Sequence, residues 1–189
     1  FYSLATDVSE YVYLAGYTNS ASGFASGGVQ NTIGGGYDAS LVKFSPTGGR
    51  IWATYYGGTD DDYGYSSAID GSGKAYLAGY TRSTTGIASG GFQNTFGGGT
   101  YDAFLAKFDS GGTVLPWATY YGGTGNDYGY GLAANVSGTV FLTGETNSAA
   151  GIASAGFKDI ITGGKDAYLA KFDTSGIRVC ATYYGGTGD

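Results

Sequence analysis

The sequence is poor in the residues that most enzymes, metal proteins and disulfide-stabilised domains require. Its 189 residues include two Pro, one Cys and neither His nor Met. One Cys cannot form an internal disulfide, and a chain without His cannot assemble a Ser-His-Asp triad, a Cys-His pair or an ordinary zinc site. We therefore expect no enzymatic activity. Paired carboxylates, for example Asp61 with Asp62, leave a hydrolase as the least favoured alternative.

Long apolar runs and an excess of positive charge are also missing. No stretch of about 18 apolar residues occurs, so no segment is predicted to span a membrane. No signal peptide is recognisable, and the first residue is Phe1 rather than Met, which predicts a processed or excised segment. The net charge of −6 disfavours nucleic acid, whose binding requires clustered Lys and Arg. The same charge disfavours anionic membrane surfaces.

Glycine and tyrosine are abundant. The chain has 38 Gly and 19 Tyr, whereas glycine usually makes up about 7% of a sequence. Gly occupies turn positions with positive φ without steric cost, and Tyr covers half-buried sheet surface while its hydroxyl stays in water. This composition predicts many short strands joined by tight turns.

The strongest signal is a threefold internal repeat. The string Ala-Thr-Tyr-Tyr-Gly-Gly-Thr occurs at 53–59, 118–124 and 181–187, at offsets of 65 and 63 residues. The flanking segments follow in register, which predicts units at 1–62, 63–127 and 128–189. Periods of this size are typical of propellers, solenoids and other arrays.

Each unit is predicted to contain four strands. In the second unit they cover about 64–69, 74–81, 101–108 and 114–121, with tight turns inside each hairpin and a long connection at 82–100. No segment shows helical periodicity over a helical length. The pattern predicts an all-β fold, a β-propeller built of four-stranded antiparallel blades with three blades in this chain. A parallel β-helix is the alternative, but its rungs are much shorter than these units.

The motifs of the repeat also resemble a known family. The runs at 117–131 and 138–144, the connection at 90–99 and the following strand at 102–108 are similar to the bacterial β-propeller repeat called SBBP. The resemblance covers essentially the whole chain and implies a secreted or surface protein of bacteria, with no single established activity. Trp52 and Trp117 are replaced by Cys180 in the third unit, and we expect that smaller residue to reduce packing area there.

Three blades are fewer than the roughly four to eight of closed propellers. Two blade faces would be left open, and soluble monomers rarely expose large apolar patches. The two chain ends match the internal junction at 122–132, so another unit is expected to fit before or after without distortion. We expect the open faces to be covered by additional repeats of a parent chain, or by a second copy that completes a six-bladed ring. Head-to-tail contacts that fail to close would build a filament instead.

An Asp and a Lys recur five positions apart in every unit. Because five positions along a strand reverse the side-chain direction, the two charges are expected on opposite faces. One hypothesis is a charged ring that lines a channel. The favoured interpretation is structural, with each charge paired on the neighbouring blade, because buried charges need partners. The framework residues predicted in this way are Asp38, Lys43, Asp102, Lys107, Asp166 and Lys171, with Trp52 and Trp117.

The links between units are acidic and rich in glycine. Ca²⁺ prefers several carboxylate and carbonyl oxygens on a flexible loop. The candidate ligands are Asp60, Asp61, Asp62, Asn126, Asp127 and Asp189. The spacing is not that of an EF-hand loop, and the favoured interpretation is Asp and Asn side chains that bond their own turns. Calcium is thus a conditional cofactor and no other cofactor is expected.

The long connections at 19–36, 82–100 and 147–164 are the candidate binding surface, because long loops on a rigid scaffold often carry function. Recurring apolar residues predict that the connections tuck onto the blade edge. The exposed polar residues could bind a surface polysaccharide or meet a neighbouring subunit. The candidate contact residues are Phe24, Gln30, Asn31, Ile87, Gln93, Asn94, Ile152 and Lys158.

The sequence as a whole favours a non-catalytic, extracellular structural or adhesive repeat module that associates with further copies of itself or with further repeats. The alternative is a lectin-like propeller that binds carbohydrate, with or without calcium. Neither hypothesis involves nucleic acid or membrane insertion.

Overall fold

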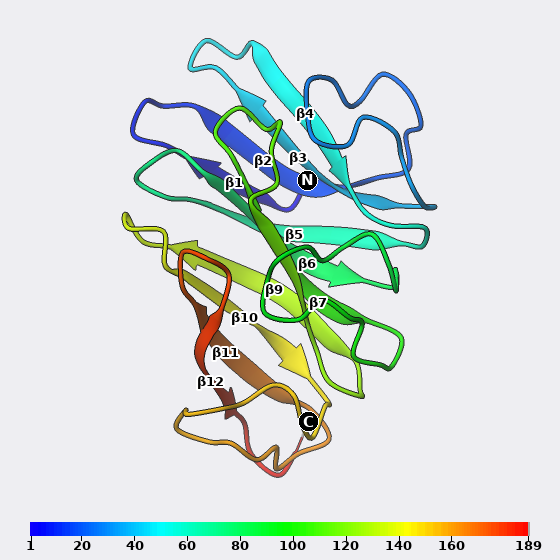
Figure 1. Cartoon of the computed structure of the whole chain (residues 1–189), viewed down its shortest axis with the longest axis vertical. Helices are drawn as coiled ribbons and strands as arrows, with labels where there is room; N and C mark the ends of the chain where they lie inside the picture. The colour runs from blue at the N-terminus through cyan, green and yellow to red at the C-terminus, as the bar shows by residue number, and fades with distance from the viewer. Residues whose placement is uncertain (189) are drawn as a thin grey trace.

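The computed structural model describes residues 1–188, which form three four-stranded antiparallel sheets and no helix. Sheet 1 contains β1 (Ser3–Thr6), β2 (Val12–Thr18), β3 (Asp38–Phe44) and β4 (Arg50–Tyr56). Sheet 2 contains β5 (Asp62–Ile69), β6 (Ala75–Thr81), β7 (Asp102–Phe108) and β8 (Trp117–Tyr121). Sheet 3 contains β9 (Asp127–Ala134), β10 (Val140–Thr146), β11 (Asp166–Phe172) and β12 (Arg178–Tyr184). Figure 1 shows the sheets in chain order from the N-terminus to the C-terminus.

Within each sheet the strands follow one another as a meander, and the register repeats. Thr18 pairs with Asp38, Thr81 with Asp102 and Thr146 with Asp166, so each long connection starts and ends at paired residues. The all-β prediction and the four antiparallel strands of each repeat are therefore confirmed.

Two strand limits differ from those predicted in the second unit. Strand β5 begins at Asp62, and β8 begins at Trp117 instead of near Val114. Pro116 precedes β8, and proline has no N–H to donate to a sheet ladder, which explains the late start. Asp127 likewise begins β9, so each later sheet starts one residue before the predicted unit boundary.

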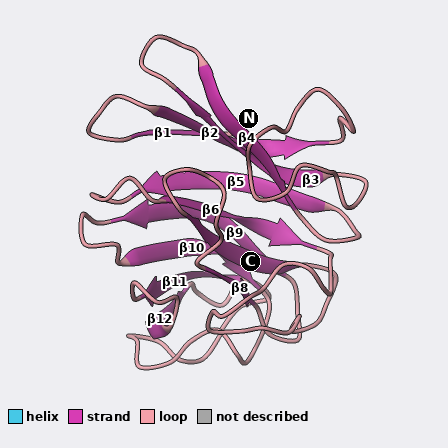
Figure 2. Ribbon diagram, turned by 45° about the horizontal axis from the view of Figure 1, so that its top comes forward, coloured by secondary structure: helices cyan, strands magenta, loops and turns pink. Residues whose placement is uncertain are grey.

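The sheets pack face to face, and Figure 2 shows them as successive layers. One core lies between sheets 1 and 2 and includes Tyr13, Leu41, Trp52, Leu77 and Phe104. The other lies between sheets 2 and 3 and is built from equivalent positions, such as Tyr76, Leu105, Trp117, Leu142 and Tyr168. Because both faces of sheet 2 are covered, β7 is buried along its whole length. Within residues 1–188 the three sheets form an open stack and do not close into a ring.

The long connections run along the outer strand of their own sheet. Ser26 and Ala53 exchange backbone hydrogen bonds of 2.9 and 3.0 Å, and Ser89 does the same with Ala118. Ser154 pairs with Ala181 in the third sheet. The connections therefore tuck onto the edges of β4, β8 and β12.

Residues 1–188 contain no helix that is long and apolar enough to cross a membrane.

Candidate functional site

A buried tyrosine closes each seam between neighbouring sheets. Tyr56 on β4 donates its hydroxyl proton to the carbonyl oxygen of Ile87 in sheet 2. Tyr121 on β8 donates to the carbonyl oxygen of Ile152 in sheet 3 at 2.6 Å. The ring of Tyr56 packs on Phe104 with centroids 5.3 Å apart, and Tyr121 packs on the equivalent residue of sheet 3 at the same distance. Each seam thus combines aromatic packing with one satisfied buried hydroxyl.

A tryptophan and a lysine cross the same seams. The Trp52 Nε1 and Lys43 Nζ atoms both donate to the carbonyl oxygen of Ser110, at 3.4 and 3.2 Å. In the next seam Trp117 and Lys107 both donate to Thr174, at 3.0 and 3.1 Å. The predicted structural role of these residues fits this geometry, although the lysine partner is a carbonyl group rather than a carboxylate. Burial lowers the pKa of Lys107.

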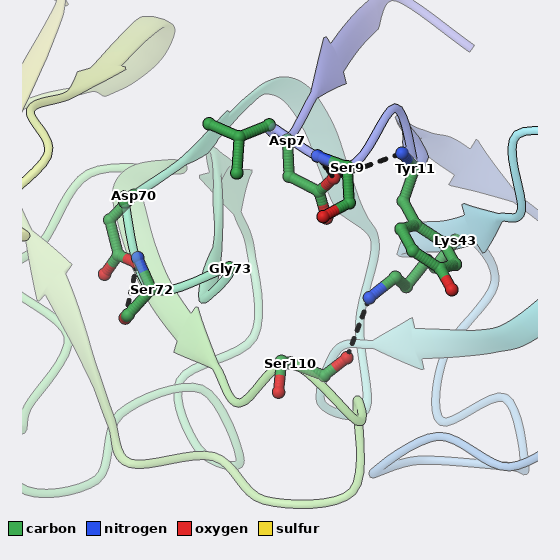
Figure 3. Close-up of a pocket in the computed structure, with 10 residues that line it drawn as sticks. Asp7, Ser9, Tyr11, Lys43, Asp70, Ser72, Gly73 and Ser110 are labelled. Carbon is green, nitrogen blue, oxygen red and sulfur yellow. Dashed lines mark hydrogen bonds between the residues drawn. The ribbon is translucent and has the colours of Figure 1, made fainter.

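A pocket with a volume of about 310 Å³ lies at the seam between sheets 1 and 2 (Figure 3). Asp7 and Asp70 lie on its walls, but each carboxylate accepts hydrogen bonds from its own turn, from Ser9 and Ser72 among others. The Lys43 ammonium, 4.5 Å from the centroid of the Tyr11 ring, points to the neighbouring sheet. The charged groups of this pocket are therefore committed to holding the two hairpin turns and the seam.

The outer face of sheet 3 is uncovered. Tyr184 is 75% exposed, whereas the equivalent Tyr121 is fully buried. Leu169 is 47% exposed at the position of the fully buried Leu105. A hollow of about 100 Å³ lies beside Cys180, at the place where sheets 1 and 2 carry an indole ring. The packing loss expected from the Trp-to-Cys change stays a prediction, because no sheet packs against this face in residues 1–188.

Among the described residues no sheet covers the opposite face of sheet 1, although Phe1 lies beside it and Val42 is only 3% exposed. A hollow of about 190 Å³ is lined by Phe24, Val42 and Phe44, among others. The equivalent residues of sheet 2 are Ile87, Ala106 and Phe108, of which Ile87 and Phe108 contribute to the pocket around Tyr56. The hollow in sheet 1 therefore corresponds to the place that a tyrosine of a preceding sheet occupies in both internal seams.

The aspartates at the links between sheets act individually. The Asp62 carboxylate accepts hydrogen bonds from the Gly58 amide and from the hydroxyls of Thr81 and Ser83. Asp127 accepts the equivalent bonds from Gly123, Thr146 and Ser148. Burial raises the pKa of Asp62 to about 7 although these hydrogen bonds oppose the rise. Each of these two residues fastens the link to the second strand of the following sheet.

The other candidate calcium ligands point elsewhere. Asp61 accepts a bond from the Tyr37 amide and lies 3.7 Å from the Arg82 guanidinium, while Asp60 is exposed. Asn126 accepts a bond from Thr100, and Asp189 lies outside the described residues. Among residues 1–188 there is no group of three or more acidic, His or Cys side chains that could hold a metal ion. Calcium binding stays a prediction, which calorimetric titration with Ca²⁺ would test.

The framework aspartates hold the ends of the long connections. Asp38 accepts bonds from the Gly34 and Gly35 amides and from Gln30. In sheet 3 a lysine replaces the glutamine, and Lys158 forms a 2.8 Å ion pair with Asp166. This bond from Lys158 lowers the pKa of Asp166, whereas burial raises that of Asp38.

The candidate contact residues of the long connections mostly face inward. Ile87 and Ile152 are almost fully buried, and Phe24 packs on Tyr55 with ring centroids 5.2 Å apart. Gln30 and Gln93 bind the framework aspartates, while Asn31 and Asn94 bond carbonyl oxygens of their own loops. These side chains hold the connections on the sheet edges.

A continuous group of tyrosines, here called the tyrosine band, crosses all three sheets. Its rings contact one another in sequence, for example Tyr17 with Tyr63 at 4.8 Å and Tyr80 with Tyr128 at 4.9 Å. Sequence reasoning treated tyrosine only as sheet-covering surface and missed the band. The sequence feature that could have predicted the band is the recurrence of tyrosine at equivalent positions of successive units. The members are Tyr2, Tyr17, Tyr37, Tyr63, Tyr65, Tyr80, Tyr101, Tyr128 and Tyr130.

Comparison with known proteins adds one similarity. No family model matches the chain. The chain is 30% identical over 145 residues to the regulatory protein FlaEY of Caulobacter vibrioides, a match that covers 76% of the chain. The same match covers 15% of FlaEY, so the chain spans only a small part of the length of this relative.

Proposed function

We propose that each sheet is one blade of a β-propeller and that the chain is a non-catalytic structural repeat module, in which further blades cover the two open faces. The further blades come from a second copy of the chain or from additional repeats. The resemblance to the SBBP repeat supports a location outside the cell or on the bacterial surface. The much greater length of FlaEY is compatible with such a module as one part of a larger protein.

The observation that carries this proposal is the pairing of an exposed tyrosine with a matching hollow. Tyr184 protrudes from one end of the stack, and the hollow around Phe24 and Phe44 lies at the other end. In both internal seams a tyrosine equivalent to Tyr184 fills the site equivalent to that hollow. The same contact repeated between two copies would be head-to-tail, which gives a ring when it closes and a filament when it does not.

The contact between copies would be weaker than an internal seam. Sheet 3 keeps Lys171, Leu169 and Tyr184 on its outer face, but three side chains that bond across the internal seams are replaced. The replacements are Gly131 for Ser3 and Ser66, Phe141 for Tyr13 and Tyr76, and Cys180 for Trp52 and Trp117. We therefore expect concentration-dependent rather than permanent association.

Sedimentation velocity over a wide concentration range, with electron microscopy of the same samples, tests the proposal. The double variant L169E/Y184E places two charges on the outer face of sheet 3 and is expected to stay monomeric. The matched control V136E/I160E adds the same charge at two highly exposed positions on other segments and is expected to associate like the parent chain. A parent chain that is monomeric and well folded at every concentration would overturn association between copies.

A further inference from the structure

The tyrosine band ends in sheet 3 at an ion pair. Tyr17 and Tyr37 form an edge-to-face pair at 5.6 Å, and Tyr80 and Tyr101 form the equivalent pair in sheet 2 at 5.1 Å. At these positions sheet 3 carries Glu145 and Lys165, whose charged atoms lie 2.8 Å apart. An edge-to-face pair of aromatic rings is thus replaced by a carboxylate and an ammonium group.

The replacement leaves a hollow beside the last tyrosines of the band. The hollow has a volume of about 340 Å³ and is lined by Glu145, Lys165, Asp166 and Ala167, within the range of about 300–1,000 Å³ typical of small-molecule sites. Burial raises the pKa of Tyr130, and the nearby Glu145 carboxylate adds to the rise. Glu145 pairs with Tyr128 in the register of β10 and β9, and directly paired residues share one face of a sheet. The Tyr128 ring is stacked on Tyr130 at 5.8 Å, so the hollow lies beside the end of the band.

The band is accessible to a ligand. Tyr2, Tyr37 and Tyr130 are 58%, 37% and 45% exposed, and the other members are partly exposed. Several hydroxyl groups pair only with one another, as Tyr2 does with Tyr17 at 2.9 Å and Tyr65 with Tyr80 at 3.2 Å. Burial and the hydrogen bond shared with Tyr65 raise the pKa of Tyr80, so its hydroxyl stays protonated at neutral pH. The surface combines rigid aromatic rings with polar rims.

The charges at the edge of the band are balanced. The Arg82 guanidinium lies 3.7 Å from the Asp61 carboxylate, and Lys165 pairs with Glu145. A polyanion would find no uncompensated cluster of cations here, and the net charge of −6 would repel it. A polycation would have to compete with both ion pairs. Charge complementarity therefore favours a neutral ligand.

We propose that the tyrosine band and the adjoining Glu145–Lys165 hollow bind one extended neutral polysaccharide. Apolar faces of successive sugar rings would lie on tyrosine rings, and sugar hydroxyls would bond the tyrosine hydroxyls. In the hollow, hydroxyl groups of one sugar residue would donate hydrogen bonds to the Glu145 carboxylate and accept a hydrogen bond from the Lys165 ammonium. The extent of the band over three sheets suits a polymer, and binding requires neither self-association nor calcium.

A proline-rich peptide is the other ligand that aromatic grooves commonly accept. Proline lacks a backbone N–H and therefore offers carbonyl acceptors without donors. Such a segment could accept a hydrogen bond from Lys165 but would offer the Glu145 carboxylate no donor besides Lys165, and covering its remaining acceptor positions costs free energy. Sugar hydroxyls both donate and accept, so they suit both members of the ion pair.

Titration calorimetry on the parent chain tests this proposal with neutral hexasaccharides of glucose, mannose, galactose, xylose and N-acetylglucosamine. Decaproline and heparin are titrated separately, as representatives of proline-rich peptides and of polyanions. We expect at least one hexasaccharide to bind and decaproline and heparin not to bind. Each of Tyr130→Ser and Glu145→Gln removes one contact with the sugar, an aromatic ring or a charged hydrogen-bond acceptor, and should raise Kd about tenfold, which corresponds to about 1.4 kcal/mol.

The control is Tyr184→Ser, which removes an exposed tyrosine outside the band and should leave Kd unchanged. If Tyr184→Ser abolishes association between copies while saccharide binding persists, the two sites are separate, as proposed. Tyr130→Phe keeps the ring and should retain more affinity for the saccharide than Tyr130→Ser. A higher Kd in Tyr130→Ser alone would then come from loss of the ring and not from misfolding. The proposal is wrong if no hexasaccharide binds at millimolar concentration, if decaproline or heparin binds in their place, or if Tyr130→Ser and Glu145→Gln leave Kd unchanged.

Discussion

The indole ring of Trp52 lies directly against the backbone of Gly112 in the neighbouring sheet. A Cβ atom on Gly112 would come within 2.5 Å of the ring, and Gly112 has a φ of +70°. The same arrangement recurs with Trp117 and Gly176 in the next seam. A residue without a side chain is thus required wherever an indole crosses to the following sheet.

We predict that Gly112→Ala strongly destabilises the chain. The left-handed backbone alone costs an alanine about 1–2 kcal/mol, and the contact with the indole adds displacement of a buried ring. Urea unfolding would measure the loss. The matched control is Gly90→Ala, because Gly90 has a φ of +68° but no atom within 4 Å of a Cβ atom. Equal losses in the two variants would contradict the role assigned to the indole contact.

The buried aspartates predict an unusual dependence of stability on pH. Burial raises the pKa of Asp62 and of Asp102 to about 7, and the charge of Asp127 adds to the effect on Asp102. An unfolded Asp has a pKa of about 3.9. Between these values the folded state binds more protons, so its stability is fully present near pH 4 and is lost as pH rises through 7. Thermal unfolding should give a higher Tm at pH 5 than at pH 8.

Two asparagine variants distinguish the contributions of Asp102 and Asp62 to the pH dependence of stability. Asp102→Asn should be tolerated and should weaken the pH dependence, because Oδ1 of Asp102 has no hydrogen-bond partner and can be replaced by an amide. In Asp62→Asn the amide nitrogen would replace Oδ1, and the Thr81 hydroxyl that donates there would have to accept a second bond, besides the one from the Ser83 amide. The expected cost is about 1–3 kcal/mol. A Tm that is the same at pH 5 and pH 8 in the parent chain would refute this account.

We further predict that Cys180→Trp strengthens association between copies. The hollow beside Cys180 is lined by Phe141, Leu169 and Lys171 and is open to solvent, and a Trp there would present an indole as sheets 1 and 2 do. The residue it would meet in a second copy is Gly48, which has a φ of +84° and no atom near a Cβ position. Sedimentation velocity should show association at lower concentration, whereas Val114→Trp, on the hairpin turn of sheet 2, should not shift it.

The sequence was sufficient to predict which segments form strands, because the threefold repeat shows each of the four strands at three equivalent places in the chain. The placement of the long connections was less accessible. Recurring apolar residues predicted that the connections lie against the sheet edges. The partner of each connection was not predictable, because Ser26 and Ala53 pair through backbone groups 27 residues apart and no side-chain pattern marks that pairing.

The surfaces were harder still to predict. Tyr17 and Tyr37 lie far apart along the chain and meet only because Thr18 pairs with Asp38 in the register of β2 and β3. Alignment of the units shows that Glu145 and Lys165 occupy the positions of that tyrosine pair. It does not show that their side chains form an ion pair, which depends on how the strands pair. The acidic residues of the links show the opposite case, since Asp61 and Asp62 are adjacent in sequence but accept hydrogen bonds from different groups.

The pairing of the long connections with β4, β8 and β12 restricts how copies of this chain can join. Exposed strand edges are the usual starting points of uncontrolled fibril growth, and here each sheet occupies part of its outer edge with its own connection. Addition of strands at the β4, β8 and β12 edges is hindered, while the open faces stay free. Any polymer of this chain should therefore lengthen by layering whole folded units, and it should come apart into intact units on dilution.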